Sequence, residues 1–316
     1  MKTLMILGGS GYLGKTFLQS FIDGKLKKYK VNKIILISRN IKNLKKQFKI
    51  NSNNILLKRM DLMKTKSLPS ADMIIHSAES SINSNNTENY RKISIQSKKI
   101  SENLYKIFSV MKKPKKIIYM SSGAVYGYNP KKIKISENHK ILLKNIKKLS
   151  KAKMFYALNK LNSEKLFLSL NNKKHNVMIV RGFTFMGIHL PLNQNYAIGN
   201  FLNEAIKKKP LIIKSKNSET VYRSYMSSDN LINSIMTMII DKRNIKNPIF
   251  NIGSDHVITI SKLAKKIANI FHVKISKPVK KKIIIDFYVP NIKKFKKYFN
   301  LDFKNTLDES IRQFIS

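Results

Sequence analysis

The stretch "MILGGSGYLGKTF", residues 5–17, decides the fold. Gly8, Gly9, Gly11 and Gly14 fall within seven positions, directly after an apolar run. Glycine weakens helices and strands because it has the most backbone freedom to lose, so the cluster indicates a place where bare backbone is needed. A pyrophosphate is one ligand that needs it, since it binds main-chain N–H groups at the start of a helix.

The surroundings of these glycines favour dinucleotide binding. Gly8, Gly11 and Gly14 form the pattern G-x-x-G-x-x-G between a predicted strand at 3–7 and a predicted helix at 12–23. In that setting glycines permit a tight turn, close approach of a phosphate, and close packing of the helix on the strand. The alternative is a glycine-rich turn without function. The expected cofactor contacts in the loop are Gly8, Ser10, Gly11, Tyr12, Leu13 and Gly14.

Short apolar runs alternate with helical patterns along the chain. After 3–7, the runs are 33–38, 55–60, 73–76, 116–121, 177–180 and 249–252. Such runs are typical of strands buried on both faces of a parallel sheet. We therefore predict an α/β fold with a doubly wound parallel sheet, the Rossmann arrangement, and a smaller, interleaved C-terminal substrate lobe. The expected division is a cofactor-binding domain, 1–181 plus 225–253, and a substrate-binding lobe, 182–224 plus 254–316.

The charge is strongly positive. The chain has 62 Lys and Arg against 17 Asp and Glu, a formal net charge of +45. The lysines are spread over nearly every segment, and Lys, Asn and Ile, which share codons rich in A and T, are abundant together. Genome composition is therefore a simpler explanation than nucleic-acid binding, and we do not expect a nucleic-acid partner. A positive surface still attracts anionic substrates.

Several classes of site and location are disfavoured by composition. The absence of cysteine excludes disulfides, thiolate metal sites and cysteine nucleophiles. None of the six histidines pairs with a second at ligand spacing, so we expect no metal site. The longest apolar stretch falls well short of the roughly 20 residues that a membrane span needs. The sequence thus predicts a cytoplasmic protein without a membrane segment.

The end of the second predicted strand bears on the choice of dinucleotide. A carboxylate there accepts hydrogen bonds from the adenosine ribose, but this chain has Ser38 at that position and Arg39 beside it. A guanidinium group pairs well with a phosphate, which favours NADP slightly over NAD. The alternative is a solvated arginine. Asp61 and Leu62, after the third predicted strand, are candidates for holding the adenine edge.

A tyrosine and a lysine supply a candidate reaction centre. In "YALNK", Tyr156 and Lys160 are four residues apart and therefore share one helix face. A phenol with a pKa near 10 is a poor base at neutral pH, but a neighbouring ammonium group favours its phenolate. A serine of "MSSGAVYG", 120–127, follows the fifth predicted strand and can bond to the same substrate oxygen. This combination is typical of hydride transfer at a carbinol carbon.

The order of these motifs resembles a known family, the extended short-chain dehydrogenases/reductases of the nucleotide-sugar epimerase/dehydratase group. The matching stretches are "GGSGYLG" (8–14), "DL" (61–62), "IIHSAE" (74–79), "SSGAVYG" (121–127), "YALNKLNSE" (156–164), "RGFTFMG" (181–187), "YRSYMSSDNL" (222–231), "FNIGS" (250–254) and "YVPNIKKFKKYF" (288–299). The resemblance spans nearly the whole chain.

The resemblance implies roles for individual residues. Ser122, Tyr156 and Lys160 match the family's catalytic triad, and the last two also contact the cofactor. The other implied cofactor contacts are Ser77, Ala78 and Phe183. The implied substrate contacts are Ser122, Thr184, Asn200, Phe201 and Arg223. The resemblance also implies a nucleotide-sugar substrate and a homodimer.

Departures from the family pattern narrow the expected reaction. Gly123 and Ala124 stand where dehydratases of the group carry an Asp-Glu pair, and Glu79 stands where many relatives have Ala. The missing acids argue against dehydration, and the breadth of the resemblance favours an NAD(P)-dependent nucleotide-sugar epimerase acting at C4. An NADPH-dependent 4-ketoreductase is the first alternative, and a 4,6-dehydratase is less favoured. A Rossmann-fold binding or regulatory protein is the alternative outside enzymes.

Overall fold

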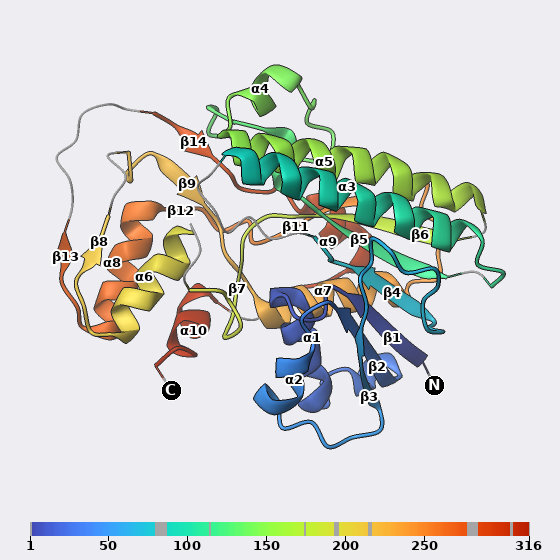
Figure 1. The fold of residues 1–316 in the computed structure, drawn as a ribbon. Helices are drawn as coiled ribbons and strands as arrows, with labels where there is room; N and C mark the ends of the chain where they lie inside the picture. Colours follow the sequence, from blue (N-terminus) through green and yellow to red (C-terminus); the bar gives the residue numbers. More distant parts are fainter. Residues whose placement is uncertain are drawn as a thin grey trace. The chain divides into compact units, whose positions relative to one another are not determined.

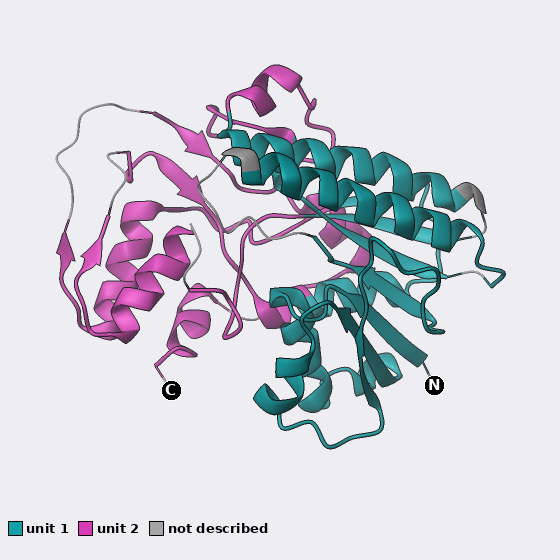
Figure 2. Ribbon diagram, viewed as in Figure 1, with its two compact units in different colours: residues 1–125, 149–181, 232–250 teal, residues 126–148, 182–231, 251–316 magenta. Residues whose placement is uncertain are grey.

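The chain folds into two compact units. A computed structural model describes residues 2–79, 87–113, 115–173, 175–192, 196–213, 217–276, 284–303 and 306–315. Unit 1 comprises residues 1–125, 149–181 and 232–250, and unit 2 comprises residues 126–148, 182–231 and 251–316 (Figure 2). The chain passes between the units several times, so neither is a continuous segment.

A seven-stranded parallel sheet forms the centre of unit 1. Its strands are β1 (Lys2–Leu7), β2 (Val31–Ser38), β3 (Ile55–Arg59), β4 (Met73–His76), β5 (Lys116–Ser122), β6 (Asn176–Gly182) and β11 (Ile249–Ile252). They lie in the order β11-β6-β5-β4-β1-β2-β3. All seven apolar runs are strands, and the predicted α/β fold with a doubly wound sheet is confirmed. The strand order reverses beside β1, which is where sheets of this kind bind ligands.

The sequence of β1 explains why it lies at the centre of the sheet. The four residues Leu4 to Leu7 are fully buried, with neighbours on both sides: Leu4 is in register with Ile34 of β2 and with Met73 of β4. Burying each such side chain contributes about 1.5–3 kcal/mol. An apolar run on both faces is stable only under helices, which the following segments supply.

Helices of unit 1 cover this sheet. They are α1 (Tyr12–Ile22), α2 (Lys42–Gln47), α3 (Thr87–Ser109), α5 (Lys151–Leu168) and most of α7 (Ser228–Ile240). Figure 1 shows α3 and α5 side by side along the sheet. Their apolar side chains join the core with those of the strands, including Leu104, Phe108 and Phe167.

Polar contacts fix α5 on the sheet as well. Glu164, which is 3% exposed, forms a buried ion pair with Arg181 of β6, at 2.7 Å between Oε2 and Nη2. Ser121 of β5 donates to Oε1 of the same carboxylate at 2.5 Å. On the side toward α3, Ser163 donates to Ser101 at 2.9 Å. Because these groups are directional, they set the rotation of α5 about its own axis.

Unit 2 is built from short strands and helices. They are α4 (Leu143–Lys147), β7 (Phe185–Met186), α6 (Ala197–Ile206), β8 (Leu211–Ile212), β9 (Val221–Arg223), β10 (Met226–Ser227), β12 (Ile258–Thr259), α8 (Ile260–Phe271), β13 (Ile275–Ser276), β14 (Asp286–Phe287), α9 (Lys293–Phe299) and α10 (Leu307–Arg312). A three-stranded sheet has the order β12-β9-β14. The unit's core lies between α6 and α8, with Leu202, Leu263 and Ile267 fully buried.

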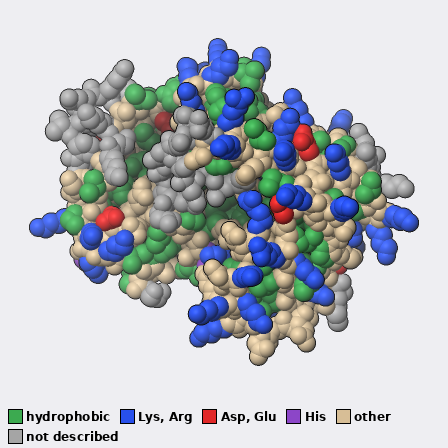
Figure 3. Space-filling model, viewed as in Figure 1, with side chains coloured by type: hydrophobic (Ala, Val, Ile, Leu, Met, Phe, Trp, Pro, Cys, Tyr) green, Lys and Arg blue, Asp and Glu red, His purple; other side chains and the backbone are tan. Residues whose placement is uncertain are grey.

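The described surface is rich in lysine and arginine. On the face shown in Figure 3, these side chains are spread over both units without gathering in one patch. No helix among the described residues is long and apolar enough to cross a membrane. In the same part of the chain, no group of three or more His, Asp and Glu side chains is arranged to hold a metal ion.

We predict that Arg181→Leu lowers the free energy of unfolding by about 3–5 kcal/mol, because it leaves the buried Glu164 carboxylate without its partner. Arg243 provides a matched control, since it pairs with Asp241 while remaining 56% exposed. Arg243→Leu is expected to cost about 1 kcal/mol or less. Urea denaturation of both variants measures the difference. Equal losses in the two variants would show that the buried pair does not hold α5.

Candidate active site

The glycine loop between β1 and α1 packs closely against neighbouring backbone. Gly8 has φ +99°, and a Cβ on it would lie 2.8 Å from the backbone nitrogen of Ala78. A Cβ on Gly14 would collide with the backbone of Gly9. Gly11 is the N-cap of α1, where no side chain caps the helix. The N–H groups of Gly8, Gly9 and Gly11 donate to carbonyls of the protein. A diphosphate would therefore be met by the first turn of α1, where N–H groups and the positive helix end stabilise an anion.

Serines surround this loop. Ser10 and Ser38, from the end of β2, share a hydrogen bond of 2.6 Å between their hydroxyl oxygens. Ser77 follows β4 and donates both its N–H and its hydroxyl to the carbonyl of Leu7, each at 2.9 Å. Tyr12 and Leu13 lie in the first turn of α1. The structure thus brings the expected contacts from the loop, β2 and β4 to one end of the sheet.

A second feature of unit 1 is a cavity of about 570 Å³ beyond the ends of β2 and β3. Arg39, Asn40, Arg59, Met60 and Asp61 line it. Arg59 was not predicted from the sequence, although it ends β3 in register with Ser38, so its place at a strand end was a usable signal. The cavity therefore carries two guanidinium groups rather than one.

The two residues expected at the adenine edge differ in their surroundings. Asp61 lines the cavity, and its carboxylate accepts the N–H of Met63 at 3.0 Å, which holds the turn after β3. Leu62 is 5% exposed and belongs to the apolar core. Its side chain therefore contributes to packing, and its carbonyl already accepts the side-chain amide of Asn103 at 3.0 Å.

The candidate reaction centre lies at the end of β5. Ser122 is its last residue, 8% exposed, and the Ser122 hydroxyl oxygen accepts the N–H of Ala124 at 3.2 Å. The Lys160 ammonium donates to the carbonyl of Met120, two residues earlier on the same strand, at 2.7 Å. Tyr156 is one turn before Lys160 on α5, with its ring centroid 5.5 Å from the ammonium nitrogen. The structure brings Tyr156 and Lys160 together beside the strand that bears Ser122.

Lys160 has a second partner at a position that the sequence marks only as a departure from the family pattern. Glu79, three residues after β4, forms an ion pair with it at 2.8 Å. The side chain of Lys160 is 5% exposed and that of Glu79 is 19% exposed. Position after a strand end was the signal, but the partner lies 81 residues away on another element, and the sequence does not show that proximity.

Burial and charge shift the pKa values of this cluster. Burial lowers the pKa of the Lys160 ammonium, but Glu79, Tyr119 and Tyr156 outweigh it and hold that pKa above its ordinary value. Burial raises the pKa of Glu79, and Lys160 opposes that shift. Burial, with Lys160, lowers the pKa of His76 to about 3. Lys160 is therefore a permanent cation, whereas His76 is neutral at physiological pH.

His76 is fully buried at the end of β4. Its ring contacts the rings of Tyr119 and Phe167 at 5.1 Å and 5.0 Å between centroids, and neither ring nitrogen has a hydrogen-bond partner among the described residues. Burial raises the pKa of Tyr119 to about 12. Both side chains therefore stay uncharged and form an apolar wall behind Lys160.

The remaining expected contacts lie in unit 2. Phe183 packs on Tyr288, at 4.7 Å between ring centroids, and the carbonyl of Thr184 accepts the N–H of Met226. On α6, Asn200 is exposed, whereas Phe201 is 4% exposed and lies in the core of the unit. The Phe201 side chain therefore packs inward, like that of Leu62.

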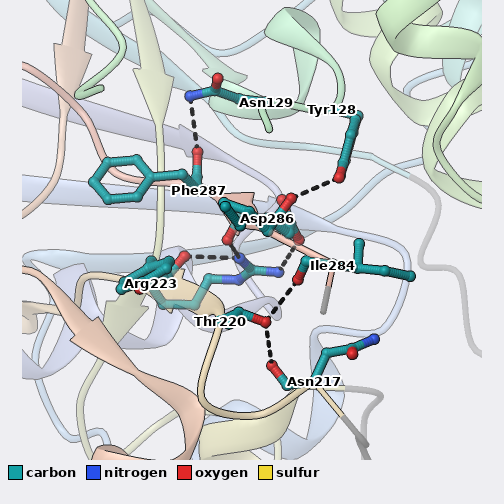
Figure 4. A network of polar contacts seen from close by, with 10 residues as sticks. Tyr128, Asn129, Asn217, Thr220, Arg223, Ile284, Asp286 and Phe287 are labelled. Carbon is teal, nitrogen blue, oxygen red and sulfur yellow. Dashed lines mark hydrogen bonds and ion pairs between the residues drawn. The ribbon is translucent and has the colours of Figure 1, made fainter. Parts of the chain in front are cut away.

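Arg223 on β9 lies in a network of polar contacts shown in Figure 4. Its guanidinium group forms an ion pair with Asp286 at 2.6 Å and donates to the carbonyl of Tyr222 at 2.8 Å. Tyr128 and Asn129 donate to backbone carbonyls of the segment that contains Asp286. Asp286 was not predicted, and it means that Arg223 already has a carboxylate partner.

Comparisons with known proteins agree with this architecture. The chain is similar in structure to the UDP-glucose 4-epimerase of Thermotoga maritima, with a TM-score of 0.77 at 16% identity, covering 99% of this chain and 97% of that one. For the dTDP-glucose 4,6-dehydratase of Streptomyces venezuelae, solved with NAD bound, the TM-score is 0.80 at 14% identity, with coverage of 99% and 97%. The UDP-N-acetylglucosamine 4-epimerase of Methanobrevibacter ruminantium gives 0.80 at 18% identity, with coverage of 99% and 98%.

At such identities these likenesses show the shared fold. No curated protein matches the sequence. The NAD dependent epimerase/dehydratase family matches residues 4–253, which is most of the chain. The match includes all seven strands of the main sheet, except for the first two residues of β1. The chain belongs to the NAD dependent epimerase/dehydratase family.

Proposed function

We propose that the protein is an NAD(P)-dependent nucleotide-sugar 4-epimerase with Ser122, Tyr156 and Lys160 at its reacting centre. The observation that carries the proposal is the anchoring of the Lys160 ammonium on Met120, with the Tyr156 ring 5.5 Å away. A buried cation beside a tyrosine ring stabilises the phenolate, which is the form of tyrosine that can accept a proton. Structural neighbours that are named 4-epimerases agree with the proposal.

The nicotinamide cofactor, when bound, supplies a carbon that accepts a hydride and returns it. Tyr156 takes the proton from the sugar hydroxyl as the hydride leaves the adjoining carbon, and gives it back on reduction. Ser122 donates a hydrogen bond to the same oxygen and stabilises the negative charge that develops on it. Lys160 stabilises the Tyr156 phenolate and offers its ammonium N–H to the cofactor ribose.

Other residues hold the two ligands in this proposal. The cofactor diphosphate lies on the loop of Gly8, Gly11 and Gly14, with Ser10, Ser77 and Ala78 beside it. Phe183 lies by the nicotinamide, and Thr184, Asn200 and Arg223 bind the nucleotide sugar. Phe201 is buried in the middle of α6, so its side chain packs in the core and its N–H and C=O groups belong to the helix. It is therefore not among these contacts. The substrate diphosphate must share Arg223 with Asp286.

A second candidate function is an NADPH-dependent nucleotide-sugar 4-ketoreductase. The specific observation in its favour is the cavity with two guanidinium groups, Arg39 and Arg59, because such groups pair well with a 2′-phosphate. The dehydratase reaction gains no support, since Gly123 and Ala124 have no proton to give. Consumption of reduced cofactor in proportion to product identifies a reductase, whereas interconversion of two epimers without net consumption identifies an epimerase.

We predict that Tyr156→Phe lowers turnover by about 10²-fold or more and leaves folding and cofactor affinity unchanged, because only the proton-transferring hydroxyl is removed. Turnover is measured by chromatography on a panel of UDP- and dTDP-sugars with NAD or NADP. Tyr298→Phe is the matched control, since Tyr298 is 39% exposed on α9, and it retains full turnover.

Near-normal turnover of Tyr156→Phe would remove the phenol from its proposed role. If the wild-type protein converts no nucleotide sugar with either cofactor, yet binds DNA with a steep dependence on salt, the protein is a binding module instead.

We predict that NADP binds more tightly than NAD, and that Arg39→Ala and Arg59→Ala each weaken NADP binding by about tenfold or more while leaving NAD binding unchanged. Each substitution removes one charge-assisted hydrogen bond to the 2′-phosphate. Titration calorimetry measures both affinities, and Arg243→Ala, outside the cavity, is the control. Equal affinity of the wild-type protein for the two cofactors would mean that these arginines are solvated and do not contact the 2′-phosphate.

A further inference from the structure

We propose that Glu79 is a positioning residue that holds the Lys160 ammonium in place and offsets its charge, so that Tyr156 keeps its proton to higher pH than beside Lys160 alone. The meaning of this arrangement for catalysis rests on the proposed function. The electrostatic effect itself does not, and it can be measured without a substrate.

The Lys160 ammonium group is held by two hydrogen-bond partners. An ammonium group has three N–H donors. One is directed to the carbonyl of Met120 at 2.7 Å and a second to the Glu79 carboxylate at 2.8 Å. These two partners come from β5 and from the segment after β4, so they hold the group from two sides. One N–H group then remains for a ribose hydroxyl of the cofactor. Its direction is set by the other two N–H groups, which already have partners.

Glu79 also balances the positive charge of Lys160. The groups that face it are Tyr119 on β5, Tyr156 on α5, Glu79 after β4 and His76 on β4. Tyr119 and His76 are uncharged near neutral pH. Glu164, the next acid on α5, is already paired with Arg181. Among the described residues, Glu79 is therefore the carboxylate that balances this ammonium.

Glu79 and Tyr156 also border a common space. Both line one small cavity of about 10 Å³ between α3 and α5, together with Tyr90, Ser94 and Asn159. A carboxylate and a phenolate that border the same cavity repel each other, and burial strengthens this repulsion because water screens it less. Glu79 thus opposes ionisation of Tyr156 in two ways: directly, and by neutralising Lys160.

With Glu79 ionised, Tyr156 sits beside a balanced pair, so its pKa is less depressed than beside a lone ammonium. Replacing Glu79 with a neutral residue leaves the Lys160 charge unbalanced, and while Lys160 stays protonated this lowers the pKa of Tyr156. The same replacement also lowers the pKa of Lys160 itself, because Glu79 no longer opposes the effect of burial. A nearby charge typically shifts a pKa by about one unit or more, which corresponds to a tenfold change in the phenolate fraction.

The experiment is a titration of Tyr156 by its phenolate absorbance. Because the chain has 13 tyrosines, the signal is taken as the difference between each protein and its Tyr156→Phe partner. We expect the midpoint to fall by about one pH unit in Glu79→Gln and in Glu79→Ala, relative to the wild type. Glu79→Asp, which keeps the charge, is expected to stay within a few tenths of a unit of the wild type.

Glu102→Gln is the matched control, because it removes one carboxylate from the exposed side of α3, where Glu102 pairs only loosely with Lys98 at 3.7 Å. Its midpoint is expected to equal that of the wild type. A midpoint that is unchanged or raised in the neutral Glu79 variants would overturn the proposal. A loss of thermal stability in Glu79→Ala without a shift of the midpoint would assign Glu79 a structural role instead.

Two neutral variants keep the test decisive if one of them fails to fold. The result is also independent of the proposed function. If the protein converts no nucleotide sugar, the proposed function is wrong. The effect of the charge at residue 79 on the titration midpoint of Tyr156 can still be measured in that protein.

Discussion

The hydrogen bond from the Lys160 ammonium to the carbonyl of Met120 is the interaction on which the candidate site depends. A cation that is almost completely buried at the end of a parallel sheet is costly unless its donors are paired. Met120 and Glu79 meet this requirement from two strand ends, which fixes the ammonium group in space. Tyr156, one turn away on the same helix face, is then held beside the end of β5, where Ser122 lies.

The same requirement determines how α5 lies on the sheet. Tyr156, Lys160 and Glu164 follow each other at intervals of four residues, so they form one stripe along the helix. Two members of this stripe are buried charges, each with a partner on another element: Glu79 and Arg181. Apolar packing alone permits small rotations of a helix, but charged groups that must keep their partners do not. The pair at Glu164 therefore supports the orientation of the residues one and two turns before it.

The fold could be predicted from the sequence because its signals are local and repeated. Each buried strand is a short apolar run, and the glycine loop lies between a strand and a helix, as Gly8 and Gly14 require. The site was only partly accessible in this way. Glu79 and Asp286 each pair with a residue far along the chain, and one sequence without such pairings cannot show it. Arg59 was accessible from its place at a strand end, but it was not predicted. Leu62 and Phe201 were expected near ligands from their place in a motif, but their side chains turn toward the apolar core.

We propose that a fixed ammonium group links the tyrosine to a cofactor held by the glycine loop. A crystal structure of the protein with a nicotinamide dinucleotide bound is the decisive measurement. We expect the diphosphate on the loop of residues 8–14 and the Lys160 ammonium within hydrogen-bonding distance of a nicotinamide ribose hydroxyl, roughly 3.5 Å or less, with its bond to Met120 intact. A cofactor whose ribose lies beyond the reach of Lys160, or a loop that does not contact the diphosphate, would rule this arrangement out.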